Sequence, residues 1–202
     1  MDAAREVYGA QYPIISRYVD ILTSTAVDWG LLGPREADRV WDRHILNCAA
    51  LSGLIAADSS VADVGSGAGL PGIPLALLRS DLRVTLIEPL LRRFTFLEET
   101  VEQLGIADRV QVVRSRAEDH DQSYNFVVAR AVAPLDRLIG SCNPLRAKGG
   151  VILALKGESA ADEVAAAERQ LNAAGLVAEV LSVRPQPGLE PATVVRLRER
   201  SG

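Results

Sequence analysis

The stretch DVGSGAGLPG at residues 63–72 decides the fold of this chain. It overlaps the apolar run VADV at 61–64 and leads into a stretch of helical character. Three glycines at alternate positions, Gly65, Gly67 and Gly69, let the backbone turn sharply and bring a ligand against the main chain without obstruction by a Cβ atom. A glycine-rich turn between a strand and a helix is typical of an α/β sheet that binds a nucleotide-like ligand at its carboxyl edge.

Short apolar runs separated by helical stretches continue this pattern along the chain. Each run is apolar on both faces, as strands are when helices cover a sheet from both sides. The runs are VADV (61–64), VTLI (84–87), VQVV (110–113), FVVA (126–129) and VILAL (151–155), with helical stretches at 91–104 and 159–174. They predict a doubly wound, parallel α/β sheet, and two further runs at 176–183 and 193–198, joined by a Pro/Gly-rich turn, predict a final hairpin.

The residues ahead of the loop have a different character. Apolar side chains at residues 14–26 fall on a helical stripe that Gly30 ends, and Pro34 precedes a second helix-like run. We therefore expect two packed helices in a small N-terminal extension, residues 1–58, followed by an α/β domain at residues 59–202.

Composition excludes several classes of protein. With 202 residues, of which 48% are hydrophobic, the chain fits one compact domain or a domain with a small appendage. Its net charge of −4 argues against indiscriminate binding to nucleic acid or anionic membranes. The two cysteines, Cys48 and Cys142, are far apart and belong to no CxxC or His/Cys cluster, so we expect neither a disulfide framework nor a metal site.

The N-terminal sequence indicates where the protein resides. Residues 1–7 contain no apolar core of a signal peptide, and the uncharged stretch at 45–57 has 13 residues, whereas a bilayer-crossing helix needs roughly 20. We expect no membrane association and a cytoplasmic location.

The glycine loop has two competing interpretations. Gly67, Gly69 and Gly72 satisfy GxGxxG literally, which is typical of an NAD(P)-dependent oxidoreductase. Against this, Asp63 places a carboxylate where phosphates would be repelled, and prolines after the loop remove amide donors that could bind a pyrophosphate. A carboxylate suits instead a cofactor with cationic groups, such as S-adenosylmethionine. Glu88, at the end of the second strand, is placed to accept hydrogen bonds from ribose hydroxyls of either cofactor. Two alternatives remain. The glycine loop could be a tight strand-to-helix connection that binds no ligand, or the protein could be a binding module that has lost catalysis.

Several motifs together resemble a known family. They are DRHILNC (42–48), DVGSGAGLPGIPLA (63–76), VTLIEP (84–89), RSRAED (114–119), ARAVAPL (129–135) and LALKG (153–157). In this combination the chain resembles, over nearly its whole length, the RsmG (GidB) family of 16S ribosomal RNA guanine-N7 methyltransferases. The resemblance implies a class I, Rossmann-like methyltransferase fold with a seven-stranded, mostly parallel sheet and S-adenosylmethionine as cofactor. The implied substrate is 16S rRNA or the small-subunit particle, methylated at a guanine of the 530 loop (guanine 527 in the family's usual rRNA numbering).

The resemblance also implies site residues. It places Gly65, Leu70, Ala117, Glu118 and Arg130 in the cofactor pocket, and the reasoning from the loop and strand ends adds Asp63, Gly67 and Glu88. Arg130, at the end of the fourth strand, is the expected catalytic residue. Lys156, Arg93 and His44 are candidates to grip the guanine or the flanking phosphates.

The chemistry of guanine N7 simplifies what such a site must do. N7 carries an exposed lone pair in the ring plane, so no proton has to leave it and no dedicated general base is needed. The site has to align the reacting atoms, and orientation alone can lower the barrier by roughly 7 to 11 kcal/mol. The fourth strand ends in Ala129 and Arg130 and lacks the acid/amide-Pro-Pro-aromatic run expected for methylation of an exocyclic amine, which agrees with a ring nitrogen as acceptor.

Overall fold

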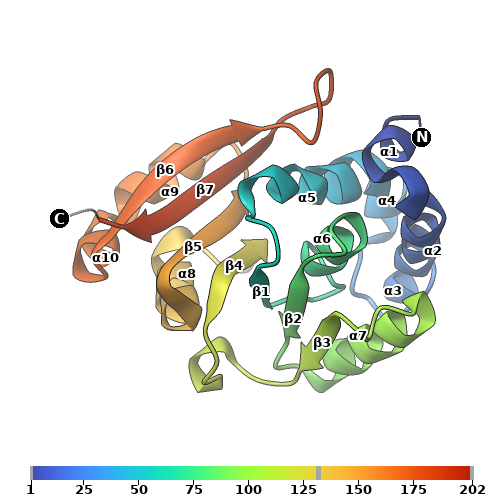
Figure 1. The fold of residues 1–202 in the computed structure, drawn as a ribbon, viewed down its shortest axis with the longest axis horizontal. Coiled ribbons are helices and arrows are strands. Elements are labelled where there is room, and N and C mark those ends of the chain that lie inside the picture. Colours follow the sequence, from blue (N-terminus) through green and yellow to red (C-terminus); the bar gives the residue numbers. More distant parts are fainter. Residues whose placement is uncertain (1, 131–132, 201–202) are drawn as a thin grey trace.

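A sheet forms the middle layer of the computed structural model, which describes residues 2–130 and 133–200 (Figure 1). Within these residues seven strands lie side by side in the order β3-β2-β1-β4-β5-β7-β6. They are β1 (Ser60–Val64), β2 (Arg83–Ile87), β3 (Val110–Val113), β4 (Tyr124–Arg130), β5 (Arg146–Lys156), β6 (Leu176–Val183) and β7 (Ala192–Glu199). Residues 131 and 132 of the ARAVAPL motif lie outside the described residues.

The topology confirms the predicted sheet. β1 to β5 are mutually parallel, whereas β7 runs antiparallel to both β5 and β6, as expected of a final hairpin. The chain goes from β1 outward to β2 and β3 and then returns to place β4 on the other side of β1. This reversal of strand order is where α/β sheets bind their ligands.

Helices cover both faces of the sheet (Figure 1). One face carries α6 (Gly72–Leu78) and α7 (Leu91–Leu104), the latter with the predicted bounds. The other carries α8 (Leu135–Cys142), α9 (Ala160–Ala166) and α10 (Glu168–Ala173). The single helix expected at 159–174 is thus two helices, because the buried Ala167 leaves helical geometry between them.

The N-terminal extension is more broken than two helices. Its first arm comprises α1 (Asp2–Tyr8), η1 (Gly9–Gln11), α2 (Tyr12–Thr23) and α3 (Thr25–Asp28), and its second comprises α4 (Pro34–Ala37), η2 (Trp41–Leu46), α5 (Asn47–Ala49) and η3 (Ala50–Leu54). The first arm breaks at Ser24, whose ψ angle of −85° departs from helical geometry and whose hydroxyl and amide both donate to the Asp20 carbonyl. The second arm begins at Pro34, as predicted, and contains a wide π-helical turn at η2.

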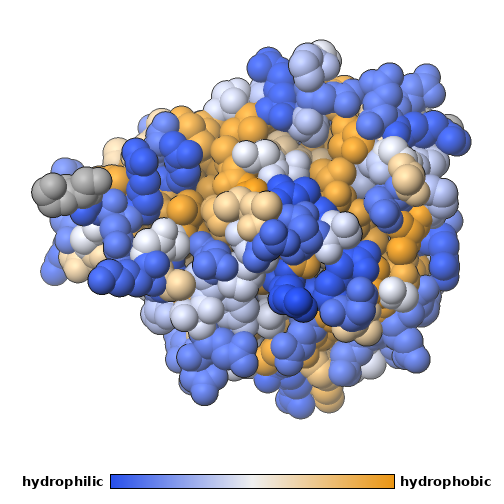
Figure 2. All heavy atoms as spheres, in the orientation of Figure 1, coloured by the Kyte–Doolittle hydropathy of each residue, from blue (hydrophilic) through white to orange (hydrophobic). Residues whose placement is uncertain are grey.

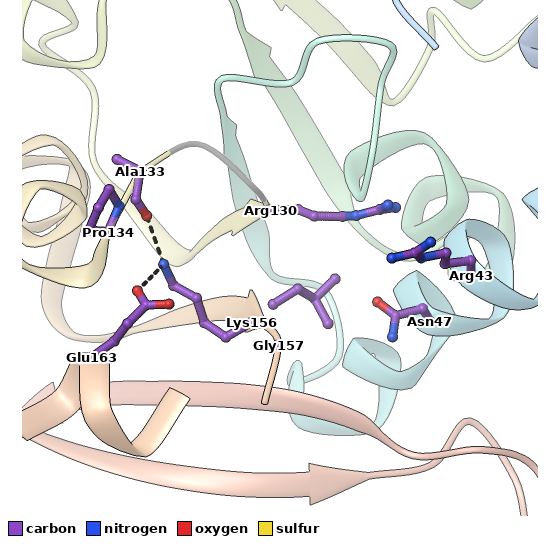
Figure 3. Close-up of a pocket in the computed structure, with 9 residues that line it drawn as sticks. Arg43, Asn47, Arg130, Ala133, Pro134, Lys156, Gly157 and Glu163 are labelled. Carbon is purple, nitrogen blue, oxygen red and sulfur yellow. Dashed lines mark hydrogen bonds and ion pairs between the residues drawn. The ribbon is translucent and has the colours of Figure 1, made fainter. Parts of the chain in front are cut away.

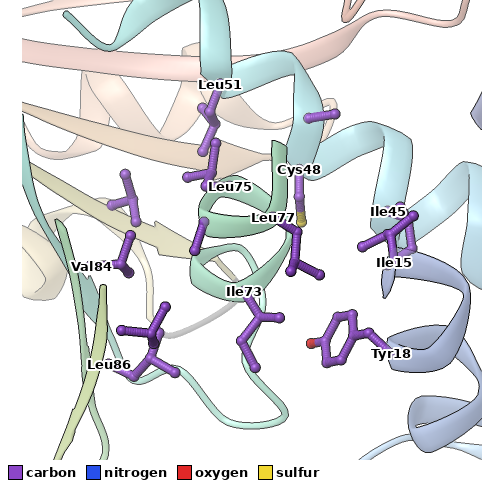
Figure 4. Packing of buried hydrophobic residues seen from close by; sticks show 14 of the residues in the cluster. Ile15, Tyr18, Ile45, Cys48, Leu51, Ile73, Leu75, Leu77, Val84 and Leu86 are labelled. Atoms are coloured by element: carbon purple, nitrogen blue, oxygen red, sulfur yellow. The ribbon is translucent and has the colours of Figure 1, made fainter. Parts of the chain in front are cut away.

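The extension and the sheet share one hydrophobic core (Figure 4). Ile15 and Tyr18 of α2 and Ile45 of η2 pack with Ile73 of α6 and Leu86 of β2, and all five are fully buried. Burying an aliphatic side chain of this size contributes about 1.5–3 kcal/mol, so the interface stabilises both parts. The boundary proposed between residues 58 and 59 marks a change in sequence pattern. The segments on its two sides fold around the same core.

Hydrophilic and apolar side chains are mixed on the face of the molecule seen in Figure 1. Figure 2 shows hydrophilic side chains spread over the face seen in Figure 1, with separate apolar areas between them. None of the helices in the described part of the chain has the length and apolarity needed to span a membrane.

Candidate functional site

Two hollows lie at the carboxyl edge of the central strands. The smaller hollow, about 260 Å³, is lined by Val64, Gly65, Ile87, Pro89, Leu90, Ser115, Arg116, Ala117, Glu118 and Ser141. The larger hollow, about 750 Å³, is lined by Arg43, Asn47, Arg130, Ala133, Pro134, Leu155, Lys156, Gly157 and Glu163. The smaller one gathers the ends of β1 and β2 and the turn after β3, and the larger one gathers the ends of β4 and β5 with the second arm of the extension.

The glycine loop has the left-handed backbone that its sequence predicts. Gly65, Gly67 and Gly69 have φ angles of 68°, 60° and 99°, which side-chain-bearing residues rarely adopt. The amides of Gly65 and Ser66 both donate to the carbonyl of Ile87, at 2.9 and 3.3 Å, so the loop is fastened to the end of β2.

The side chain of Glu88 also holds the glycine loop in place. Its Oε2 accepts from the Gly67 amide at 3.0 Å and its Oε1 from the Leu90 amide at 3.1 Å. Glu88 is only 1% exposed, and the guanidinium of Arg93 lies 3.9 Å away. Its role toward a ribose stays a prediction, and the structure adds a role in shaping the loop.

Asp63 lies beneath the loop, wholly buried on the α6 side of the sheet. Its Oδ2 accepts from the Gly72 amide at 2.9 Å, and its Oδ1 has no hydrogen-bond partner among the described residues. Burial raises the pKa of this carboxyl to about 7, against the lowering effect of the Gly72 amide. A Cβ atom on Gly72 would lie 2.4 Å from the Leu86 side chain and 2.7 Å from Asp63 Oδ2, so this glycine serves close packing of helix on strand.

Tyr18 holds the loop from the extension, which sequence reasoning missed. Its buried hydroxyl donates to the carbonyl of Ala68 at 2.8 Å across 50 positions of sequence. The helical stripe in the sequence identified Tyr18 as a core residue, but nothing in it indicated the hydroxyl's partner.

The pair Tyr18 and Tyr8 gives a matched test of this bond. We expect Tyr18→Phe to lower the free energy of unfolding by about 1–3 kcal/mol, because the buried Ala68 carbonyl loses its donor. Tyr8→Phe is the control, since the buried Tyr8 hydroxyl has no hydrogen-bond partner among the described residues. Urea unfolding of both variants measures the difference, and equal losses would show that the Tyr18 bond contributes nothing specific.

Ala117 and Glu118 meet Gly65 in the smaller hollow, as the resemblance implies. They belong to the short turn η4 (Ala117–Asp119) after β3, where Ala117 is buried and Glu118 is exposed. Glu118 Oε1 accepts from the Ser141 hydroxyl at 2.5 Å, which lowers the pKa of the carboxyl. Leu70 is half-buried and lines neither hollow.

Arg130 ends β4 at the larger hollow, with its guanidinium fixed by the extension. It donates to His44 Nδ1 and, at 3.5 Å, to Cys48 Sγ. His44 is 5% exposed, and its Nε2 lies 3.0 Å from Glu36 Oε2. Burial and then the charge of Arg130 lower the pKa of His44 to about 4, so the imidazole is neutral near pH 7. Its burial argues against the predicted direct contact of His44 with a substrate.

Lys156 also lines the larger hollow but its ammonium is engaged (Figure 3). Its Nζ donates to the Ala133 carbonyl and to Glu163 Oε2, both at 2.7 Å, and the side chain is 8% exposed. Glu163 Oε2 also accepts from the Leu135 amide at 3.0 Å. The pair therefore ties the chain after β4 to α9 and builds the wall of the hollow.

Sequence reasoning did not select two polar residues that line the larger hollow. Arg43 and Asn47 line the larger hollow, and the Arg43 side chain is 55% exposed. Both belong to the DRHILNC motif and are four positions apart, so helical spacing within that motif could have identified them. Arg93, by contrast, lies near Glu88 and lines neither hollow.

Comparison with known proteins points to one family. The family model GidB, described as rRNA small subunit methyltransferase G, matches residues 11–187. A protein of Kineococcus radiotolerans is 50% identical over 100% of this chain and 81% of its own length. One of Mycolicibacterium gilvum is 54% identical over 87% of this chain and 78% of its own length. Both relatives carry the name ribosomal RNA small subunit methyltransferase G.

Solved structures agree on the fold. The precorrin-6y C5,15-methyltransferase of Geobacter metallireducens matches with a TM-score of 0.56 and 16% identity, over 84% of this chain and 90% of that one. The ribosomal protein L11 methylase of Lactobacillus delbrueckii matches with a TM-score of 0.60 and 18% identity, over 77% of each chain. At these identities the likeness shows a class I methyltransferase fold.

Proposed function

This chain belongs to the ribosomal RNA small subunit methyltransferase G family, and from that membership we propose that it methylates N7 of a guanine in the 530 loop of 16S rRNA. It is a methyltransferase of small-subunit rRNA, and its cofactor is S-adenosylmethionine. The substrate is the rRNA itself or the small-subunit particle, which gives a cytoplasmic place of action.

The smaller hollow fits the nucleoside part of the cofactor. Val64, Ile87 and Leu90 give it apolar walls for a purine ring, and the Gly65 backbone offers an approach with no Cβ atom. Glu118 is exposed at its rim and retains acceptor capacity beyond its bond from Ser141. The carboxylate of Glu88 lies beside the glycine loop and suits hydroxyl groups, whereas Asp63 is wholly buried beneath the loop and lines neither hollow.

The chemistry requires positioning more than proton transfer. When bound, S-adenosylmethionine supplies an electrophilic methyl group on a positively charged sulfur. The guanine N7 lone pair is free to attack, so no residue of the chain has to remove a proton from it. The chain has to hold the guanine in line, which Arg130, Arg43 and Asn47 support by presenting donors for the base or its phosphates at the larger hollow.

The observation that carries this proposal is that the described residues lining the larger hollow include no free base. Among its described lining residues the only carboxylate is Glu163, which is ion-paired with Lys156 and accepts from the Leu135 amide. The nearby imidazole of His44 is buried, and its Nδ1 accepts from Arg130. Such a site suits an acceptor atom that already carries its lone pair.

Calorimetry tests the cofactor side of the proposal. We expect S-adenosylmethionine to bind and NADH not to bind, although Gly67, Gly69 and Gly72 satisfy the dinucleotide pattern. Family membership favours the methyltransferase, and no observation of the site favours hydride transfer. Preferential binding of NADH would overturn the proposal in favour of the oxidoreductase.

A further inference from the structure

One carboxylate, that of Glu36 in α4, lies close both to Arg43 and to His44, the acceptor of Arg130, at the larger hollow. Its Oε1 lies 3.5 Å from Arg43 Nη1, and its Oε2 lies 3.0 Å from His44 Nε2. On its other side His44 accepts from Arg130 through Nδ1. Figure 3 shows the guanidinium groups of Arg43 and Arg130 directed to the same part of the hollow.

We propose that Glu36 is a positioning residue, which orients Arg130 toward the methyl-donor site through His44 and holds Arg43 directly on the RNA side. This inference rests on the proposed function, because it takes Arg130 to act at the site of methyl transfer. It assigns to the N-terminal extension a task in the reaction beyond covering the sheet.

The protonation of His44 explains how the connection works. A neutral imidazole has one N–H donor and one acceptor nitrogen, and a guanidinium can only donate. Nδ1 must therefore be the acceptor for Arg130, which leaves the hydrogen on Nε2, an atom that lies 3.0 Å from Glu36 Oε2 but makes no hydrogen bond among the described residues. The negative charge of the Glu36 carboxylate beside Nε2 favours a hydrogen on that nitrogen electrostatically, and so favours the one tautomer that can accept from Arg130. Burial and the charge of Arg130 keep His44 in this neutral form by lowering its pKa.

The arginines need such support for two reasons. An arginine side chain loses about 2 kcal/mol of rotamer entropy when it is fixed, so an unsupported guanidinium samples other orientations. Arg43 and Arg130 also carry like charges beside one hollow, and the negative charge of Glu36 next to Arg43 and His44 reduces that repulsion. The π-helical turn η2 places Arg43 and His44 together, and such turns are frequent at functional sites.

Paired substitutions of His44 test the tautomer. The side-chain oxygen of asparagine can replace Nδ1 as acceptor for Arg130, whereas the amide of glutamine replaces Nε2 and leaves Arg130 without its acceptor. We expect His44→Gln to weaken S-adenosylmethionine binding or single-turnover transfer by about 10- to 100-fold, as for a lost hydrogen bond to a charged group, and His44→Asn to lose much less. Equal losses in the two variants, at equal thermal stability, would overturn the assignment.

Substitutions of Glu36 test the double role. Glu36→Ala should impair both the cofactor dissociation constant and the KM for RNA, whereas Arg43→Ala should raise only the KM for RNA. Glu36→Gln keeps an acceptor for Nε2 but loses the charge, so we expect it to retain more cofactor affinity than Glu36→Ala. Glu179→Ala is the matched control, because Glu179 pairs with Arg196 on the β6–β7 hairpin away from both hollows.

A comparison with Arg130→Ala distinguishes an error in the role of Glu36 from an error in the placement of Arg130 at the site. If Arg130→Ala destroys transfer while Glu36→Ala and His44→Gln behave as wild type, the positioning role is wrong and the proposed function stands. If Arg130→Ala itself keeps normal cofactor affinity and rate, the placement of Arg130 in the site is wrong, and the role of Glu36 falls with it. Thermal midpoints of all variants identify losses that come from unfolding.

Discussion

Replacing Arg130 by alanine should lower the rate of methyl transfer by about 100-fold or more, the cost of removing a fixed donor from a site of changing charge. The guanidinium lies at the larger hollow and is fixed by His44 and Cys48, so it is pre-oriented before any substrate arrives. Single-turnover transfer with labelled S-adenosylmethionine measures the rate, and calorimetry measures cofactor affinity separately.

Two further variants make the Arg130 result interpretable. Arg130→Lys keeps the positive charge but lacks the planar fork that reaches both His44 and Cys48, so we expect an intermediate rate. Arg184→Ala is the control, since Arg184 is exposed and donates to the Leu189 carbonyl within the β6–β7 turn. Full activity in Arg130→Ala would remove Arg130 from the site.

The second large effect concerns stability and pH, through Asp63. Its carboxyl has a usual pKa of 3.8 and, in the folded protein, a pKa raised by burial to about 7. Between these values the folded state binds a proton that the unfolded state has released, so stability falls as the pH rises through this window. The full contribution is present below about pH 4 and amounts to about 4 kcal/mol over the window, at 1.36 kcal/mol per pKa unit.

Asp63→Asn isolates that contribution. Asparagine can still accept from the Gly72 amide through its side-chain oxygen but does not titrate. Free energies of unfolding are measured in urea from pH 4 to pH 8. As the pH rises, the value for the variant should increase by about 4 kcal/mol relative to that for the wild type. A difference that stays constant over this range would mean that the carboxyl titrates normally in the folded protein.

The local sequence pattern was sufficient to predict the strands of the sheet and the glycine loop. Strands buried on both faces are continuous apolar runs, so their positions could be identified from residues such as those of VADV and VTLI. Helix α7 was predicted with its observed bounds because its stripe is uninterrupted until Gly105, which has a φ angle of 67° and ends the helix. The extension was predicted less well, since its break at Ser24 accompanies side-chain bonds from Thr23 and Ser24 to the Asp20 carbonyl that the helical stripe does not indicate.

The candidate site shows the limit of one-dimensional reasoning more clearly. The family resemblance placed Gly65, Ala117 and Glu118 in one pocket, and the three residues do line the smaller hollow, while their contact with a cofactor stays a prediction. The motifs could not reveal that Lys156 is committed to Glu163, because that ion pair depends on the packing of α9 against the end of β5. For the same reason Glu36, Arg43 and Asn47 were missed although they neighbour a selected histidine.

The central claim is that this chain moves a methyl group to N7 of a guanine in small-subunit rRNA. The most direct measurement is incubation with labelled S-adenosylmethionine and 16S rRNA, naked and in the small-subunit particle, followed by digestion to nucleosides and mapping of the labelled position. The account predicts label in 7-methylguanosine at a single position of the 530 loop, in at least one of the two substrates. Label at another atom or another loop, or none in either substrate, would contradict it.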